Sequence, residues 1–161
     1  MIVRRHVILS RYFEHDDGSL PEIEVTFSDP SRVSAAFAHL YACGARDVTP
    51  GGGCLCIRAE QIERPFAGPD DAALVANGIA DPFHVVLASV TGKDSPIPDL
   101  GVLVFTNSLT LDYRMGQDWG ANEVRSLVSL LVQLQALGGN VSVPWWETDG
   151  QRDFQAALLG A

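Results

Sequence analysis

The chain has 161 residues and a formal net charge of −9, with 47% hydrophobic and 19% charged residues. This balance excludes a disordered chain, and the length suffices for one globular domain with its own core. The acidity argues against nucleic acid as a partner, because binding to a phosphate backbone depends on clustered Lys and Arg. Such a charge would attract a basic protein or a small cation, and the alternative is that it serves only to keep the chain in solution.

The chain carries no signal for secretion or membrane insertion. No long apolar run follows Arg4 and Arg5, and no span of about eighteen apolar residues occurs elsewhere. The three cysteines, Cys43, Cys54 and Cys56, form no disulfide-framework spacing. We therefore expect a soluble cytoplasmic protein without a membrane partner.

The first predicted elements form a hairpin. Alternating apolar and polar residues predict strands at Ile2–Phe13 and Glu22–Phe27, with Asp17-Gly18 as a turn between them. In the second strand, Ile23 and Val25 are expected to face inward. The hairpin would then have one face in water.

A helix follows the hairpin. Asp29 is placed as its N-cap, Pro30 occupies its first position, and Gly44 is placed to end it. An extended piece at Arg46–Thr49 comes next, and after a glycine-rich loop Cys54–Glu60 is a predicted strand.

The middle of the chain has the weakest pattern, especially from Gln61 to Pro82. A short helix is predicted at Asp70–Asn77 and a strand at Val85–Val90. Thr91–Asp99, with one Gly and two Pro, is predicted as a surface loop.

The segment from Leu100 to Val143 has the clearest pattern. It predicts strands at Gly101–Phe105 and Leu109–Met115, a broadly apolar helix at Asn122–Leu137 and a strand at Val141–Val143.

The chain closes on a helix predicted at Asp149–Leu159, with Thr148 and Gln151 as its capping box.

These elements predict a single α+β domain over residues 1–161, with mainly antiparallel sheet built from hairpins and with helices packed on one face. The order hairpin, helix, strand occurs in residues 1–60 and again in residues 99–161. The two halves could therefore be a duplication, although they share no residue-level similarity.

Two sequence features could be mistaken for ligand sites. Gly51-Gly52-Gly53 lacks the Gly-Lys-Ser/Thr of a phosphate-binding loop and is interpreted as a flexible connection. Cys54 and Cys56 lie two apart on a strand, roughly 6.6 Å from one another, which is near the outer limit for a disulfide and awkward for one zinc ion. The favoured interpretation is buried structural thiols, and we predict neither a metal nor a cofactor.

The densest polar and aromatic cluster gives the candidate functional surface: Asp112, Arg114, Asp118 and Trp119. The alternative interpretation is structural. In it, Asp112 and Arg114 form cross-strand ion pairs on the solvated side, and Asp118 favours the start of the following helix.

Trp145 and Trp146 are the candidate partner anchor, because adjacent strand residues face opposite sides and one Trp would then be exposed near Phe154. The alternative is that both Trp pack the last helix on the sheet.

No catalytic residue can be assigned, and the leading hypothesis is a non-catalytic protein-binding module. Immunity and adaptor proteins of bacteria share this size and acidity, without any motif in common. The alternative is a small-molecule-binding domain or small enzyme, with a pocket between sheet and helices lined by Asp112, Arg114 and a histidine. A homodimer is expected as readily as a monomer.

Overall fold

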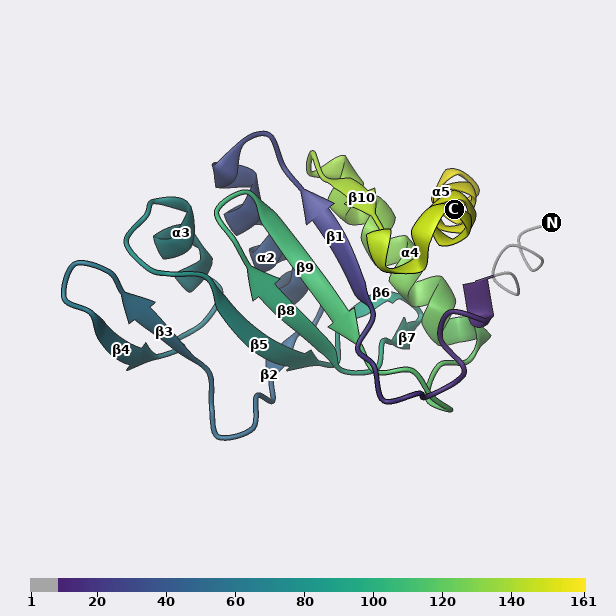
Figure 1. Ribbon diagram of the computed structural model, residues 1–161, viewed down its shortest axis with the longest axis horizontal. Helices are drawn as coiled ribbons and strands as arrows, with labels where there is room; N and C mark the ends of the chain where they lie inside the picture. The colour runs from purple at the N-terminus through teal and green to yellow at the C-terminus, as the bar shows by residue number, and fades with distance from the viewer. Residues whose placement is uncertain (1–8) are drawn as a thin grey trace.

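A six-stranded antiparallel sheet forms the centre of the computed structural model, which describes residues 9–161 (Figure 1). In their order across the sheet, the strands are β10 (Asn140–Ser142), β1 (Glu22–Thr26), β9 (Ser108–Tyr113), β8 (Leu100–Val104), β5 (Phe83–Ala88) and β2 (Arg46–Asp47). All neighbouring strands in it run antiparallel. The predicted α+β class with a mainly antiparallel sheet is confirmed.

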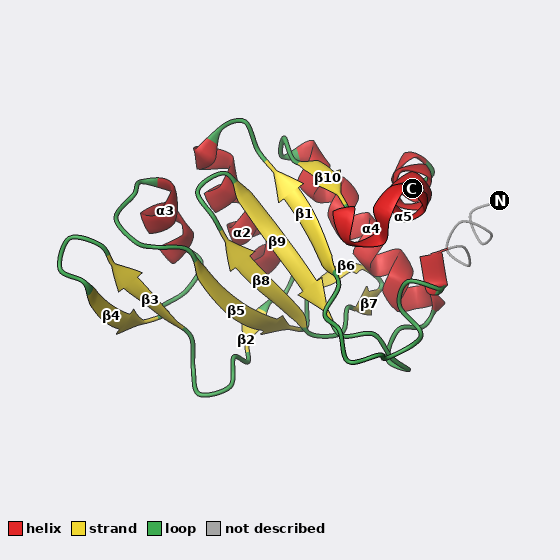
Figure 2. Cartoon of the chain, viewed as in Figure 1, coloured by secondary structure: helices red, strands yellow, loops and turns green. Residues whose placement is uncertain are grey.

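Helices cover one face of this sheet. The helices α2 (Pro30–Ala42) and α4 (Ala121–Ala136) lie behind the sheet in the view of Figure 2. The helix α5 (Glu147–Leu159) packs beside α4 and follows a short 3₁₀ helix, η1 (Pro144–Trp146). Figure 1 shows no helix in front of β1, β9, β8 or β5, so the described part of the chain leaves the opposite sheet face open.

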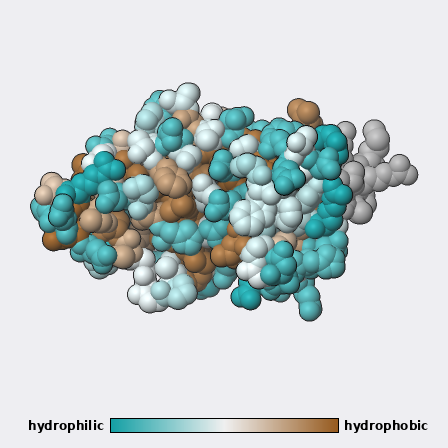
Figure 3. All heavy atoms as spheres, in the orientation of Figure 1, coloured by the Kyte–Doolittle hydropathy of each residue, from teal (hydrophilic) through white to brown (hydrophobic). Residues whose placement is uncertain are grey.

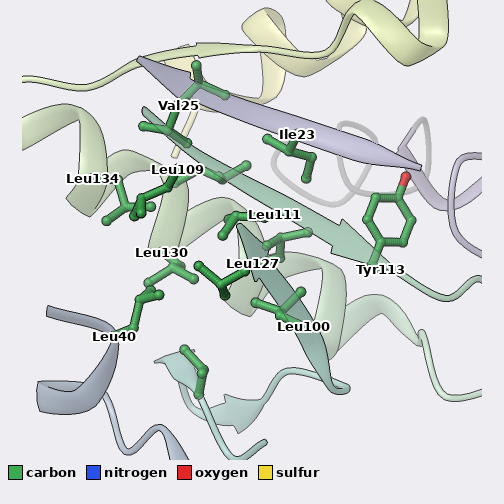
Figure 4. Packing of buried hydrophobic residues seen from close by; sticks show 14 of the residues in the cluster. Ile23, Val25, Leu40, Leu100, Leu109, Leu111, Tyr113, Leu127, Leu130 and Leu134 are labelled. Carbon is green, nitrogen blue, oxygen red and sulfur yellow. The ribbon is translucent and has the colours of Figure 1, made fainter. Parts of the chain in front are cut away.

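The core lies between the sheet and the two helices. Figure 4 shows side chains of β1 and β9 directed toward leucines of α4, with Leu40 of α2 beside them. The exposed fraction is 1% or less for each of these core residues: Ile23, Val25, Leu40, Leu109, Leu111, Leu127, Leu130 and Leu134. Each such side chain contributes about 1.5–3 kcal/mol by leaving water, so this layer is the main source of stability.

The local signals at both ends of α2 are confirmed. Asp29 accepts a hydrogen bond from the Ser31 amide at 3.0 Å, and Pro30 is the first helical residue. Gly44 follows the helix with a φ of +99°, a left-handed conformation that suits glycine.

The predicted strands and helix of the Leu100–Val143 segment are confirmed to within one or two residues. The breadth of the apolar surface on α4 has a structural cause. Its second side is covered by a small hairpin of β6 (Thr91–Lys93) and β7 (Ser95–Pro96). The prediction of a surface loop at Thr91–Asp99 is therefore wrong.

The β6–β7 hairpin is held on α4 by Ser126, which is fully buried. Its Oγ accepts from the amides of Gly92 and Lys93 and donates to the Ser95 carbonyl. A Cβ on Gly92 would lie 2.0 Å from the Ser126 carbonyl oxygen, so only glycine permits this approach.

The predicted strand Ile2–Phe13 falls partly outside the described residues, and its last part is wrong. Residues 9 and 10 are helical and residues 11–13 form a turn, with the Tyr12 N–H bonded to the Leu9 carbonyl at 2.9 Å. Leu9, Tyr12 and Phe13 are all buried, because residues three and four apart lie on one helical face. The sheet partners of β1 are instead β9 and β10.

A second hairpin projects at the far end of the sheet in Figure 1. It consists of β3 (Cys54–Ile57) and β4 (Ile62–Pro65), so the strand predicted at Cys54–Glu60 ends three residues early. The short helix α3 (Asp71–Ala76) confirms the prediction at Asp70–Asn77. At its start Asp71, only 4% exposed, pairs with Arg64 at 2.6 Å.

The predicted capping box of the last helix is wrong. The helix α5 begins at Glu147, and the side chain of its N-cap residue, Trp146, makes no capping hydrogen bond to the helix. Gln151 Oε1 instead accepts from the Val143 amide at 2.7 Å, and Gln155 Nε2 donates to the Val141 carbonyl at 2.8 Å. Both glutamines thus satisfy backbone groups on the side of β10 that faces away from β1.

No helix within residues 9–161 has the length and apolar character needed to cross a membrane.

Candidate functional site

The open sheet face brings together polar side chains from three central strands. Glu22 of β1 lies directly opposite Asp112 of β9, and on the other side Asp112 lies opposite Gly101 of β8. His84 of β5 belongs to the next row, opposite Leu103. Because strand residues alternate between faces, all of these side chains point away from the helices.

A side-chain hydrogen bond crosses this face. His84 Nε2 and Asp112 Oδ2 are 2.8 Å apart, although the strand β8 lies between β5 and β9. Gly101 makes this contact possible, since a Cβ there would lie 2.1 Å from Asp112 Oδ1. The side chain of His84 is 43% exposed and that of Asp112 is 19% exposed, so both remain accessible to solvent.

The charge of the face is negative except at its border strand β2, where Arg46 lies opposite Ala88 of β5 and so on the same face. The strands β1, β5, β8, β9 and β10 contain three carboxylates, those of Glu22, Glu24 and Asp112, and contain neither Lys nor Arg. Val86 and Leu103 are half-buried apolar residues on the same face. Figure 3, viewed toward this face, shows hydrophilic and hydrophobic residues interspersed over it.

The four predicted surface residues do not lie together. Asp112 is on the open face, whereas Arg114 lies past the end of β9 and pairs with Asp16 at 3.2 Å. Trp119 is only 5% exposed and donates its Nε1 hydrogen to the Arg114 carbonyl. Asp118 does not cap α4, whose N-cap is Gly120.

Arg114 and Asp118 line a pocket at one end of the sheet, with a volume of about 690 Å³. Its lining includes the buried Ile97 and Met115 and the carboxylates of Asp16, Asp99, Asp118 and Glu123. The Gly18 amide, and then Arg114, lower the pKa of Asp16 by hydrogen bonding to its carboxylate. Neither Asp112 nor a histidine lines this pocket, in contrast to the predicted small-molecule site.

The two adjacent tryptophans lie in η1 rather than at a strand end, and they have different surroundings. Trp146 packs against Tyr12 with 5.0 Å between ring centroids, and its Nε1 donates to the Tyr113 hydroxyl. Trp145 is 46% exposed. The packing interpretation therefore applies to Trp146, and only Trp145 is available as an anchor.

Cys43 belongs to a polar cluster that ties α2 to α4. Gln133 donates to the Gly92 carbonyl, which turns its Oε1 toward His39 Nε2 at 2.6 Å. His39 Nε2 therefore donates a hydrogen, and cannot take the proton of the Cys43 thiol 3.4 Å away. Burial also raises the pKa of the Cys43 thiol, so this Cys–His pair lacks an activated nucleophile.

The other two cysteines correct a prediction. Cys54 is exposed and Cys56 is half-buried, so they are not buried structural thiols. Within residues 9–161, no group of three or more His, Cys, Asp or Glu residues is arranged to hold a metal ion.

The sequence predicts a histidine near Asp112 without specifying which one, and the structure places His84 there. The available signal was Gly101, an isolated glycine inside an apolar strand, which often marks a close approach of another group. Alternation along the two flanking strands could then have placed His84 and Asp112 on the same face.

The fold and these sites define an acidic α+β protein with an open sheet face. Searches of protein-family models, of curated proteins and of solved structures find no match to the chain.

Proposed function

We propose that this protein is a non-catalytic binding module whose open sheet face receives a basic partner protein. The observation that carries the proposal is the set of three carboxylates on β1 and β9, adjacent strands that contain neither Lys nor Arg, whereas Arg46 lies at the β2 border of the face. Such a face attracts positive side chains and repels the phosphate backbone of nucleic acids.

The register of the sheet indicates where a positive side chain would bind most favourably. Glu22 and Asp112 are direct cross-strand neighbours, and like charges in that position destabilise a sheet. His84 approaches Asp112 from the other side, and no cation of the described chain pairs with Glu22. An arginine or lysine from a partner would relieve this repulsion.

Apolar contacts would add to the electrostatic attraction. Val86 lies directly opposite Gly101, and Leu103 lies between His84 and Thr110 in the adjacent row. Both side chains are half-buried, and they would cover the alkyl part of a bound arginine or lysine.

The test uses a short synthetic peptide in which arginine alternates with threonine, labelled for fluorescence anisotropy. At an ionic strength of about 0.15 M, the E22Q/D112N variant should bind it about tenfold more weakly than the unaltered protein, or roughly 1.4 kcal/mol. The control is E60Q/D94N, which removes two carboxylates from the exposed turns of the two small hairpins.

The location of binding gives a second readout. Amide chemical shifts of β1, β8 and β9 should move on addition of the peptide, and those of the hairpin β3–β4 should not. Equal weakening in both variants, or shift changes spread over the surface, would refute this function.

The three free cysteines bear on the cellular compartment. Cys43, Cys54 and Cys56 are all unpaired in the structure. Free thiols are typical of proteins kept in reducing conditions, which supports a cytoplasmic location.

A second candidate function, small-molecule binding, is favoured by the pocket that Arg114 and Asp118 line. Its volume of about 690 Å³ lies within the range of roughly 300–1,000 Å³ typical of ligand sites. Native mass spectrometry of gently purified protein tests this function and also gives the number of copies in the assembly. A retained small molecule that R114A/D118N loses would support it, and a molecule that this variant retains equally well would exclude the pocket as its site.

A further inference from the structure

The pair Cys54 and Cys56 is not used by the function proposed above. Both residues lie in β3, with Leu55 between them only 2% exposed. Because Leu55 faces the core, the strand alternation directs both cysteines to the opposite side. Cys54 is exposed and Cys56 is half-buried, so two thiols lie side by side at the surface.

The strand keeps these thiols apart but within reach of one shared atom. Successive residues on one face of a strand are roughly 6.6 Å apart, and their Cβ atoms point in parallel rather than toward one another. That arrangement opposes a disulfide, which needs Cβ atoms about 3.8 Å apart. Rotamers in which the two side chains lean toward one another would move each Sγ along the strand by about 1 Å, and the sulfurs would then be roughly 4.6 Å apart.

A separation of about 4.6 Å corresponds to a linear sulfur–metal–sulfur unit with bonds near 2.3 Å. A tetrahedral zinc ion would require shorter sulfur–sulfur distances and two further ligands. No group of three metal-binding side chains occurs in residues 9–161, so the described chain offers no such complement. The geometry therefore favours an ion that accepts two ligands.

The surroundings favour a cation over an anion. Glu63 lies opposite Cys56 in the hairpin, and Asp81 hydrogen-bonds through its amide to the Cys56 carbonyl. Desolvation raises the pKa of the Cys56 thiol, and the charges of Asp81 and Glu63 raise it further. Asp81 is also paired with Arg58 at 2.7 Å, so Glu63 is the carboxylate whose charge favours a cation beside Cys56.

We propose that Cys54 and Cys56 bind one soft monovalent cation, of which Cu(I) is the model, between their two sulfurs. Soft thiolate ligands select such ions over hard divalent ones. On binding, two S–H bonds break and two Cu–S bonds form. Two protons leave to solvent, and copper remains Cu(I), so no electron is transferred.

The test is an anaerobic titration of the reduced full-length protein with Cu(I) held by the coloured chelator bicinchoninate. Loss of the chelator colour measures the copper that the protein takes. The unaltered chain should take one equivalent, and C54S and C56S should each lose this uptake. The matched control is C43S, which removes the cysteine that follows α2 and should bind as the unaltered chain does.

The release of two protons gives an independent readout. Below the thiol pKa values, the apparent affinity should fall by about 100-fold for each pH unit of acidification. Circular dichroism of each variant checks that the fold is retained. No uptake by the unaltered chain, uptake that persists in C54S, or a loss in C43S would each overturn the proposal.

Discussion

Replacing Ser126 by alanine tests the reasoning about how the β6–β7 hairpin is held on α4. The Ser126 side chain is fully buried, and its hydroxyl serves three backbone groups. It accepts from Gly92 at 2.9 Å and from Lys93 at 3.1 Å, and it donates to Ser95 at 2.6 Å. Alanine would leave all three groups without this partner.

The expected loss follows from these contacts. Each hydrogen bond contributes about 1 kcal/mol, and the half-buried position of the hairpin allows water to replace part of this. Alanine also favours a helix interior over serine by about 0.5 kcal/mol. S126A should therefore lose about 2 kcal/mol of unfolding free energy, which lowers the thermal midpoint by roughly 4–8 °C for a chain of this length.

Urea unfolding followed by circular dichroism measures this loss. The control is S34A on α2, where the structure shows no hydrogen bond from the serine side chain, so the helix should become slightly more stable. Amide exchange at Gly92 and Lys93 should accelerate in S126A alone. A difference below about 0.5 kcal/mol between the two variants would refute the assigned role of Ser126.

Three further predictions concern the core and the pH dependence of stability. Within residues 9–161, the buried Tyr41 hydroxyl has no hydrogen-bond partner, and burial raises its pKa to about 12. In urea unfolding, Y41F should therefore have a free energy of unfolding equal to or above that of the unaltered protein, and a loss above about 1 kcal/mol would contradict this. R64A leaves the buried Asp71 carboxylate without its cation and should cost about 2 kcal/mol in the same assay, whereas R64K should cost less. Hydrogen bonds from Ser31 lower the pKa of Asp29 below 3.8, so the stability it adds is present at neutral pH and lost as the pH falls through the lowered pKa. The thermal midpoints of D29A and the unaltered protein should therefore differ at pH 7 and converge below pH 3.8, and a constant difference would exclude this cause.

Elements with local end signals could be predicted from the sequence. Asp29, Pro30 and Gly44 act through groups within a few residues, so the bounds of α2 followed from the chain alone. The helix α4 was equally clear because its apolar residues repeat at the helical period over sixteen residues.

Elements fixed by distant contacts could not be predicted. The hairpin β6–β7 is short, and its position depends on Ser126, more than thirty residues away in the chain. The pair of His84 and Asp112 likewise depends on the register of three strands and on the missing side chain of Gly101. Predicting such contacts requires the order of the strands in the sheet, and local sequence patterns do not give that order.

The two glutamines of α5 determine how this sheet can grow. The open side of an outer strand is normally a template on which another chain can add a strand. Gln151 and Gln155 occupy hydrogen-bonding groups there, and the strand at the opposite border, β2, has only two residues. Addition of a further strand, as in a sheet-extended dimer or a fibril, is thereby opposed at one border, and the short β2 offers few backbone groups for it at the other.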